Sequence, residues 1–434
     1  MGAGGGARPR AADDDVHAGD ETPMSDEFEE LWSELAPVGR NRITGGYRRF
    51  SWGPADTEAR GWFVSAARAR GLDVETDGNG NLWAWWGAPG PEAVVTGSHL
   101  DSVPDGGAYD GPLGVVGALA AIGELRRRGL RPRRPLAVTV FAEEEGARFG
   151  VPCLGSRLLT GAITPERAGG LADADGVTWA RAMEAAGLDP GRLGADHELL
   201  GRIGAFVELH IEQGRALVHS GDPVGVASAV WPHGRWRLDF SGQADHAGTT
   251  RLADRSDPML PFAEAVLEAR RAAEANGALA TVGKVRVSPN GTNAVPSRVR
   301  AWLDARAADE GALRAVVERV DAAARGSAAE HGVTVNGFLE SKSPLVEFDH
   351  RLRDRIAARV GGETGGLPLL TTGAGHDAGV LATAVPTAML FVRNPTGTSH
   401  APEEAATGAD CRAGVAALAD VLADLTGAGP RSRE

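Results

Sequence analysis

Short, wholly apolar runs that end in polar loops constrain this fold more than any other sequence feature. Residues 93–97, 135–142 and 203–209 have the length and continuous hydrophobicity of strands buried on both faces. An Ala/Leu-rich stretch at 112–128, closed by Gly129, is typical of a helix. Strands that alternate with helices predict an α/β fold, a three-layer catalytic domain with a mostly parallel sheet.

The pattern changes near Asp222, which indicates a second domain. Residues 235–241, 280–287, 298–306 and 333–339 read as strands, with helices expected at 258–276 and 310–325. This βαββαβ order predicts an inserted α+β sandwich. We therefore expect a disordered tail (1–24), a catalytic domain in two parts (25–221 and 342–428), an inserted lid and dimerisation domain (222–341), and a short tail (429–434).

Charge and cysteine content exclude several classes of function. The formal net charge of the 434 residues is −13, which argues against nucleic acid or an anionic membrane as the main partner. No apolar run reaches the roughly 18 residues that a membrane span requires. The N-terminus lacks the apolar core of a signal peptide. Cys153 and Cys411 form no disulfide framework, so we expect a cytoplasmic protein.

Several metal-type ligands follow predicted strands or lie in Gly-containing loops. They are His99 with Asp110, Glu145, His210 and His400. Because the carboxyl ends of parallel strands meet at one edge, these side chains can hold two divalent ions that share one carboxylate.

Two neighbouring acids complete this set. Glu144 would lie beside the metals as general base, and Asp101, two residues after His99, would fix the imidazole tautomer. A solvated face is the alternative for the acidic run 143–145, and its position directly after a buried strand argues against that alternative.

Seven motifs occur in an order that resembles a known superfamily. They are SHLDSVPDGGAYDG, FAEEEGARFG, ELHIEQG, GQADHAGTT, NGTNAVPSRVRAWLDAR, GAGHD and TSHAPEE. Together they resemble the dimetal aminoacylase/carboxypeptidase superfamily, in particular its amidase branch. That branch includes N-carbamoyl-L-amino acid hydrolases, β-ureidopropionases, allantoate amidohydrolases and ureidoglycolate amidohydrolases. The resemblance spans about residues 25–428.

The resemblance implies a role for each matching position. His99 and His210 would hold one metal, Glu145 and His400 the other, with Asp110 bridging and Glu144 as base. His210 stands where the peptidase branch has an acidic residue, which points to the amidases. Further residues would serve the substrate: Gln213 and His376 in the pocket, Asn293 and Arg306 on a carboxylate, and His246 at the developing oxyanion across a dimer interface.

Structural alternatives remain open for these substrate residues. His246 and Asn293 would also suit turns, Arg306 a surface charge, and Gln213 an ordinary loop position. Arg393, a few residues before His400, departs from many relatives. It would contact a second carboxylate or a ureido oxygen, or else form a salt bridge at the pocket wall.

These patterns predict a metal-dependent hydrolase that cleaves a linear, non-peptide C–N bond of a small carboxylate such as allantoate or an N-carbamoyl-L-amino acid. We expect a homodimer with two divalent ions per subunit, Zn²⁺ or Mn²⁺, with Co²⁺ or Ni²⁺ also suitable. The alternatives are an N-formyl- or N-formimidoyl-glutamate hydrolase, an aminoacylase or dipeptidase, and a non-catalytic binding protein. A dinucleotide-binding protein is disfavoured because no strand leads into a G-x-G-x-x-G turn.

Overall fold

The computed structural model describes Met1, residues 25–361 and residues 366–430. The predicted N-terminal tail, apart from Met1, lies outside the described residues, as do residues 431–434. Two residues that we assigned to the C-terminal tail are ordered: β17 (Gly429–Pro430) pairs with β4 (Leu130–Arg131) beside the end of the last helix.

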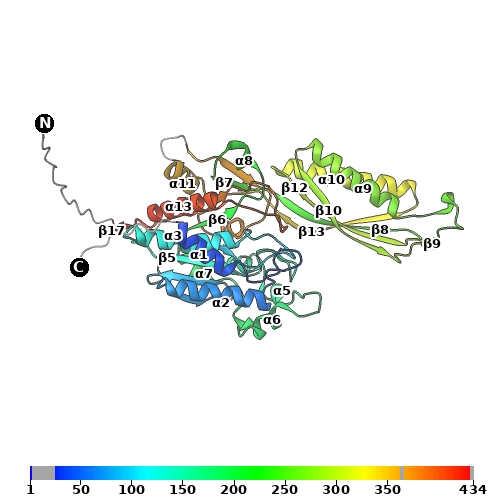
Figure 1. Cartoon of the computed structure of the whole chain (residues 1–434). Helices are drawn as coiled ribbons and strands as arrows, with labels where there is room; N and C mark the ends of the chain where they lie inside the picture. Colours follow the sequence, from blue (N-terminus) through cyan, green and yellow to red (C-terminus); the bar gives the residue numbers. More distant parts are fainter. Residues whose placement is uncertain (2–24, 362–365, 431–434) are drawn as a thin grey trace.

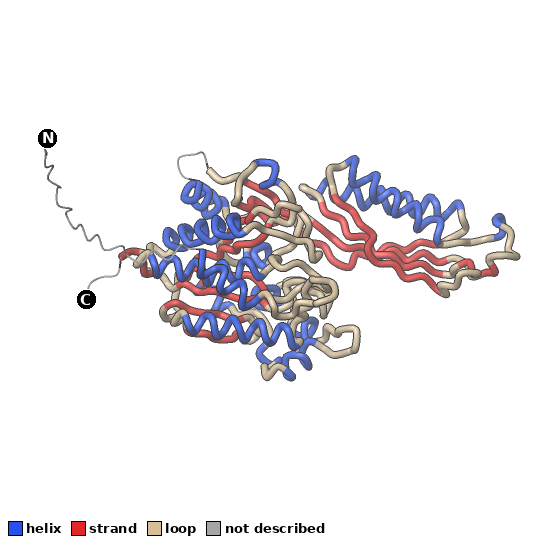
Figure 2. The backbone as a smooth tube through the Cα atoms, viewed as in Figure 1, coloured by secondary structure: helices blue, strands red, loops and turns tan. Residues whose placement is uncertain are grey.

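A large mixed sheet forms the centre of the body of the molecule (Figures 1 and 2). In the described part of the chain it has nine strands, in the order β1-β2-β5-β3-β6-β16-β7-β14, with β15 also on β7. The central strands β5, β3, β6 and β16 are parallel to one another. The bounds are β1 (Asp73–Thr76), β2 (Leu82–Trp86), β3 (Ala93–His99), β5 (Leu136–Phe141), β6 (Ile203–Ile211), β7 (Val224–Val230), β14 (Val346–Glu347), β15 (Leu369–Thr372) and β16 (Thr387–Val392).

Alternate residues of the central strands face two separate cores. On β3, Val94 packs into one hydrophobic cluster and Val95 into another, because successive side chains point to opposite faces. Both faces are covered, so the strands read as continuous apolar runs. The three-layer α/β fold with a mostly parallel sheet is confirmed.

Helices cover both faces of this sheet. One face is covered by α1 (Ser25–Leu35), α2 (Pro54–Ala69), α3 (Pro112–Arg127), α11 (His350–Gly361) and α13 (Gly408–Leu425). On the other lie α4 (Leu154–Thr160), α7 (His197–Arg202), α8 (Ala216–Ser220) and α12 (Asp377–Leu381). Two more, α5 (Pro165–Gly169) and α6 (Trp179–Ala185), form a satellite core with α4. No helix in the described residues is long and apolar enough to cross a membrane.

A four-stranded antiparallel sheet extends away from the body (Figures 1 and 2). Its order is β10-β12-β8-β13, built from β8 (His233–Ser241), β10 (Leu279–Ser288), β12 (Arg298–Arg306) and β13 (Thr334–Ser343). The helices α9 (Met259–Ala275) and α10 (Glu310–Glu330) bury their apolar stripes on one face. The predicted βαββαβ order is present, with a small ribbon of β9 (Asp245–His246) and β11 (Ala294–Val295) at the far end.

The chain leaves the large sheet later than the change of pattern at Asp222 indicated. Val224–Val230 pairs with β16 inside the large sheet, and the small sheet begins at His233. On the return, β13 ends at Ser343 and β14 pairs with β7. The two connecting segments therefore lie side by side at the base of the small sheet.

Gly97 lets β3 approach β5 closely, and its replacement tests this packing. A Cβ on Gly97, whose φ is +143°, would lie 2.0 Å from the carbonyl oxygen of Thr139. We expect Gly97→Ala to lower the free energy of unfolding by about 2 kcal/mol or more. The matched control is Gly61→Ala in α2, where an added Cβ meets nothing within 4 Å. This control should stabilise the helix by about 0.5–1 kcal/mol. Equal urea midpoints for the two variants would contradict the packing argument.

Candidate active site

Four adjacent parallel strands bring the predicted ligands to one edge of the large sheet. His99 is the last residue of β3, and His210 is the penultimate residue of β6. Glu145 follows β5, and His400 follows β16. The strand order β5-β3-β6-β16 makes these positions neighbours. Ligand sites in open α/β sheets form at this carboxyl edge.

Asp110, just before α3, lies at the centre of the cluster. Its Oδ1 is 3.5 Å from His99 Nε2 and 3.2 Å from His210 Nε2. Its Oδ2 is 3.3 Å from His400 Nε2, which is 3.4 Å from Glu145 Oε2. The five residues thus form two triads that share Asp110, each close enough to hold one cation.

The imidazole tautomers suit metal binding. His99 Nδ1 is 3.1 Å from the carbonyl oxygen of Asp101, and His210 Nδ1 is 2.9 Å from that of Ile211. A carbonyl accepts only, so each Nδ1 carries the proton and each Nε2 presents a lone pair. Both Nε2 atoms are buried and have no hydrogen-bond partner. These orphaned nitrogens fit a divalent cation.

Asp101 connects the ends of β3 and β5. Its carbonyl accepts from His99, and its carboxylate accepts from the backbone N–H groups of Glu144 and Glu145, both at 3.1 Å. The carboxylate is also 3.6 Å from His99 Nδ1. Asp101 therefore orients the imidazole mainly through its backbone and the acidic loop through its side chain.

Burial and mutual repulsion give the acids of the cluster unusual pKa values. Burial raises the pKa of Glu144 well above its usual range and, with the nearby Asp110, raises that of Glu145 to about 7. Burial acts in the same direction on Asp110, but the three neighbouring histidines hold its pKa well below the usual range. The site concentrates negative charge out of water, an arrangement that bound cations relieve.

Glu144 lies between the cluster and a thiol. Its Oε2 is 3.6 Å from His99 Nε2, and its Oε1 accepts a hydrogen bond of 3.2 Å from Cys153 Sγ. One oxygen is thus anchored while the other faces the cluster. The buried thiol of Cys153 is thus a polar partner of Glu144.

Three buried acids support the cluster and were missed in the sequence. Glu143 accepts from the backbone N–H groups of residues 148 and 149 and shapes the acidic loop. Glu404 accepts from the N–H groups of residues 109 and 110 and fixes the backbone of Asp110. Glu208, buried below the cluster, accepts from Ser98 Oγ and the N–H of Ala378. Only the motif TSHAPEE and the i, i+2 spacing of Glu208 and His210 could have signalled them.

Two predicted substrate residues touch the cluster itself. Gln213 Nε2 donates to Asp110 Oδ2 at 2.7 Å and to Ser399 Oγ at 2.9 Å, so it orients the shared carboxylate. The buried ring of His376 packs edge-on against His210, with centroids 4.5 Å apart. Burial, together with the neighbouring histidines, holds the pKa of His376 well below its usual range, so this ring is neutral.

Arg306 lies at the base of the small sheet, next to the GAGHD loop. Its Nη1 donates to the carbonyl of Gly373 at 2.7 Å, and its Nε donates to Asp304 Oδ1 at 2.9 Å. It thus faces the loop that carries His376, on the same side as the cluster.

Three predicted residues do not meet the cluster within one protomer. The guanidinium of Arg393 is paired with Asp410 through Nε and Nη2, and its Nη1 donates to Gly221, the salt bridge that the sequence had left open. His246 is exposed on β9, and the carbonyl of Asn293 accepts from Ala247 beside it. Both lie at the far end of the small sheet (Figure 1).

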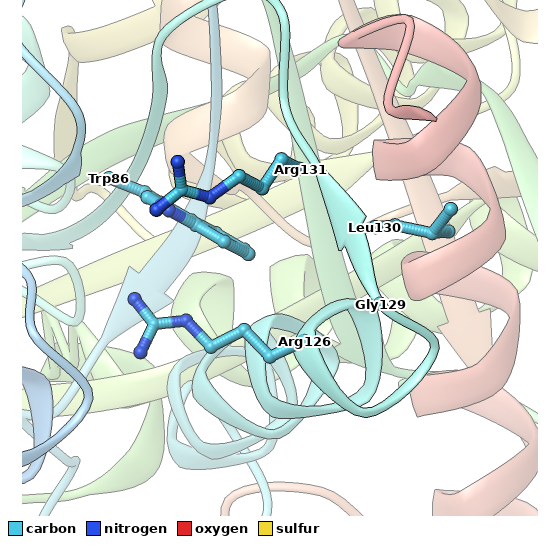
Figure 3. Close-up of a pocket in the computed structure, with 5 residues that line it drawn as sticks. All are labelled: Trp86, Arg126, Gly129, Leu130 and Arg131. Atoms are coloured by element: carbon cyan, nitrogen blue, oxygen red, sulfur yellow. The ribbon is translucent and has the colours of Figure 1, made fainter. Parts of the chain in front are cut away.

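A separate cavity of about 320 Å³ lies away from the cluster around Asp110. Trp86, Arg126 and Arg131 line it, with Arg126 stacked 4.5 Å from the indole centroid (Figure 3). Arg126 is in the last turn of α3, whereas Asp110 directly precedes the first. The helix therefore separates this cavity from the cluster, and cationic side chains at its C-terminus suit the helix dipole.

Comparison with known proteins agrees with this geometry. The model of the peptidase family M20/M25/M40 matches residues 95–424. An N-carbamoyl-L-amino acid amidohydrolase of Geobacillus stearothermophilus is 36% identical, over 90% of this chain and 96% of the relative. The allantoate amidohydrolase of Escherichia coli (strain K12) is 33% identical, over 88% and 93%.

A solved structure agrees in fold along nearly the whole chain. An amidase of the hydantoinase/carbamoylase family from Burkholderia vietnamiensis is 30% identical and superposes with a TM-score of 0.84, covering 93% of this chain and 97% of its own. Matches that span both sheets and the cluster leave one conclusion: the chain belongs to the peptidase family M20/M25/M40.

Proposed function

We propose that this chain hydrolyses a carbamoyl or ureido C–N bond in a linear, small carboxylate such as allantoate or an N-carbamoyl-L-amino acid. The observation that carries the proposal is the pair of triads that share Asp110, with Glu144 beside them. The names of the relatives, which include amidohydrolases of N-carbamoyl-L-amino acids and allantoate, support the choice of a non-peptide bond.

Two divalent cations would complete the site. His99, His210 and Asp110 would hold one, and Asp110, Glu145 and His400 the other, with Zn²⁺ or Mn²⁺ as the first candidates and Co²⁺ or Ni²⁺ as further ones. When bound, such ions supply Lewis-acid polarisation of the substrate carbonyl.

Glu144 would move the proton. The attacking water oxygen forms a bond to the carbamoyl carbon while Glu144 Oε2, the oxygen that faces the cluster, takes the proton. When the C–N bond breaks, Glu144 returns the proton to the leaving nitrogen. The hydrogen bond from Cys153 to Oε1 would hold the carboxylate in place for both transfers.

Arg306 would bind the substrate carboxylate. Its fork, which pairs with Asp304 in this structure, suits bidentate recognition of a carboxylate, and it faces the loop of His376 next to the cluster. Gln213 and His376 would shape the pocket at the cluster. Arg393, paired with Asp410, would serve the pocket wall, and its contact with substrate is the weaker interpretation.

A homodimer would supply what one protomer lacks. His246 and Asn293 lie exposed at the far end of the small sheet, so they would reach the substrate of a partner subunit rather than their own. The small sheet would then act as both lid and dimerisation surface. The two cysteines are buried and free, which is compatible with the cytoplasmic location that we propose.

Replacing Glu144 by Gln tests the proton transfer. The amide cannot accept a proton, so we expect kcat for ammonia release to fall by about 10²–10⁴-fold, with two metals per protomer still present by elemental analysis. Glu403→Gln, an exposed acid of the TSHAPEE segment, is the matched control. Full activity of metal-loaded Glu144→Gln would refute this assignment.

Replacing Arg306 by Lys tests the carboxylate clamp. Lysine keeps the charge but loses the planar fork, so we expect KM for a carboxylate substrate to rise by about tenfold. Arg300→Lys, on the same strand and paired with Asp239, is the control. An unchanged KM would exclude Arg306 as the clamp.

Mixing two inactive variants tests whether subunits share a site. We expect His246→Ala and Glu144→Gln each to be nearly inactive. Co-expressed heterodimers should regain roughly a quarter of wild-type specific activity, because half of the dimers are mixed and one of their two sites is intact. No recovery despite proven heterodimers would show that His246 does not act across the interface.

A further inference from the structure

A second cavity, of about 140 Å³, lies beside the cluster at the base of the small sheet. Its walls come from the loop after β5, from α12 and from both segments that connect the two sheets. It is therefore at the junction where a substrate between the two sheets would lie.

Two residues are shared between this cavity and the cluster. His376 lines the cavity and packs against His210, and Cys153 lines it and donates to Glu144. A group in the cavity is thus separated by one side chain from the reacting atoms.

The walls are mainly apolar. Val230, Pro344, Val346 and Val380 contribute hydrocarbon surface. Several polar residues in the wall are partly committed to backbone carbonyls. Arg157 Nε donates to Pro152 at 3.0 Å, His233 Nδ1 is 3.0 Å from the carbonyl of Trp231, and Thr383 Oγ1 donates to Val380 at 2.7 Å. Burial lowers the pKa of His233, so this ring is neutral and the charge in the wall is that of the Arg157 guanidinium.

The carboxylate clamp lies next to the cavity. Arg306 is paired in register with His233 across β12 and β8, and its Nη1 bonds to Gly373, two residues before the cavity residue Gly375. The clamp, the cavity and the cluster therefore surround one position, which matches the three substituents of an α-amino acid carbon.

We propose that this cavity takes the side chain of an N-carbamoyl α-amino acid, and that the preferred side chain is aliphatic. The inference rests on the proposed function and narrows it. Allantoate places a second ureido group where these walls offer hydrocarbon, and a buried polar group without partners is disfavoured there. N-carbamoyl-β-alanine has no side chain to fill the space.

A substrate series tests the proposal. With metal-loaded enzyme, we expect kcat/KM to increase from N-carbamoylglycine through the L-alanine to the L-valine and L-leucine derivatives. Each buried methylene should contribute roughly fourfold, for a total of tenfold or more. The panel includes allantoate and N-carbamoyl-L-glutamate, and a preference for either one would overturn the proposal.

An isosteric variant assigns the preference to the cavity. Val380→Thr places a hydroxyl in the wall without changing its shape, so the ratio of kcat/KM for N-carbamoyl-L-leucine to that for N-carbamoylglycine should fall by about fivefold. Val285→Thr, on exposed β10, is the matched control. An equal loss for both substrates, or an equal effect of the control, would contradict the assignment.

The outcomes separate this inference from the proposed function. Ammonia release that is equal across the aliphatic series refutes the cavity assignment and leaves the hydrolase proposal intact. No release from any substrate refutes the hydrolase proposal. In that case, titration calorimetry of L-leucine against glycine decides the cavity, because tighter binding of leucine that weakens in Val380→Thr supports it and equal binding excludes it.

Discussion

The carboxylate of Asp101 is the interaction on which the site depends. It accepts hydrogen bonds from the backbone N–H groups of Glu144 and Glu145, and the backbone carbonyl of Asp101 accepts one from His99 Nδ1. One residue therefore sets the tautomer of a ligand on β3 and the path of the acidic loop after β5. Because these strands are hydrogen-bonded neighbours, Asp101 fixes the loop and the imidazole at adjacent strand ends. The remaining ligands then need only the positions that β6 and β16 provide beside them.

The cluster buries several acids, and their tolerance depends on the groups that compensate their negative charge. Asp101, Asp110, Glu144 and Glu145 are drawn into a region with little access to water. Backbone N–H groups donate to the carboxylate of Asp101, and Gln213 and Ser399 donate to that of Asp110. Burial raises the pKa values of Asp101, Glu144 and Glu145, so all three acids are held where their charged forms are disfavoured. A fold that keeps several buried acids next to orphaned imidazole nitrogens is organised for cations rather than for its own stability.

Local patterns were enough to predict most of the fold, and long-range pairings were not. Continuous apolar runs identified β3, β5 and β6, and alternation identified β8 and β12. A strand buried on both faces is apolar throughout, and one buried on a single face alternates, so both patterns are visible in the sequence. The predicted boundary between the two sheets, at Asp222, was too early in the chain, because the sequence of β7 does not indicate which sheet it joins.

At the site, the order of the motifs predicted the five ligands that the structure brings together. The supporting roles of Glu143, Glu208 and Glu404 were not predicted because they depend on tertiary contacts, mostly with backbone N–H groups. The partnership of Arg393 with Asp410 depends on the packing of α13 and was equally invisible.

The position of β16 has a consequence for how the chain is made. This strand lies between β6 and β7, although it is synthesised long after both and after the whole small sheet. During translation, the hydrogen-bonding edges of β6 and β7 therefore stay open until the last part of the chain emerges. The same late segment carries His400 and Glu404, which complete the second triad and fix Asp110. We infer that the nascent chain cannot assemble the full cluster and must keep two apolar strand edges from pairing wrongly, a burden typical of high contact order that chaperones relieve.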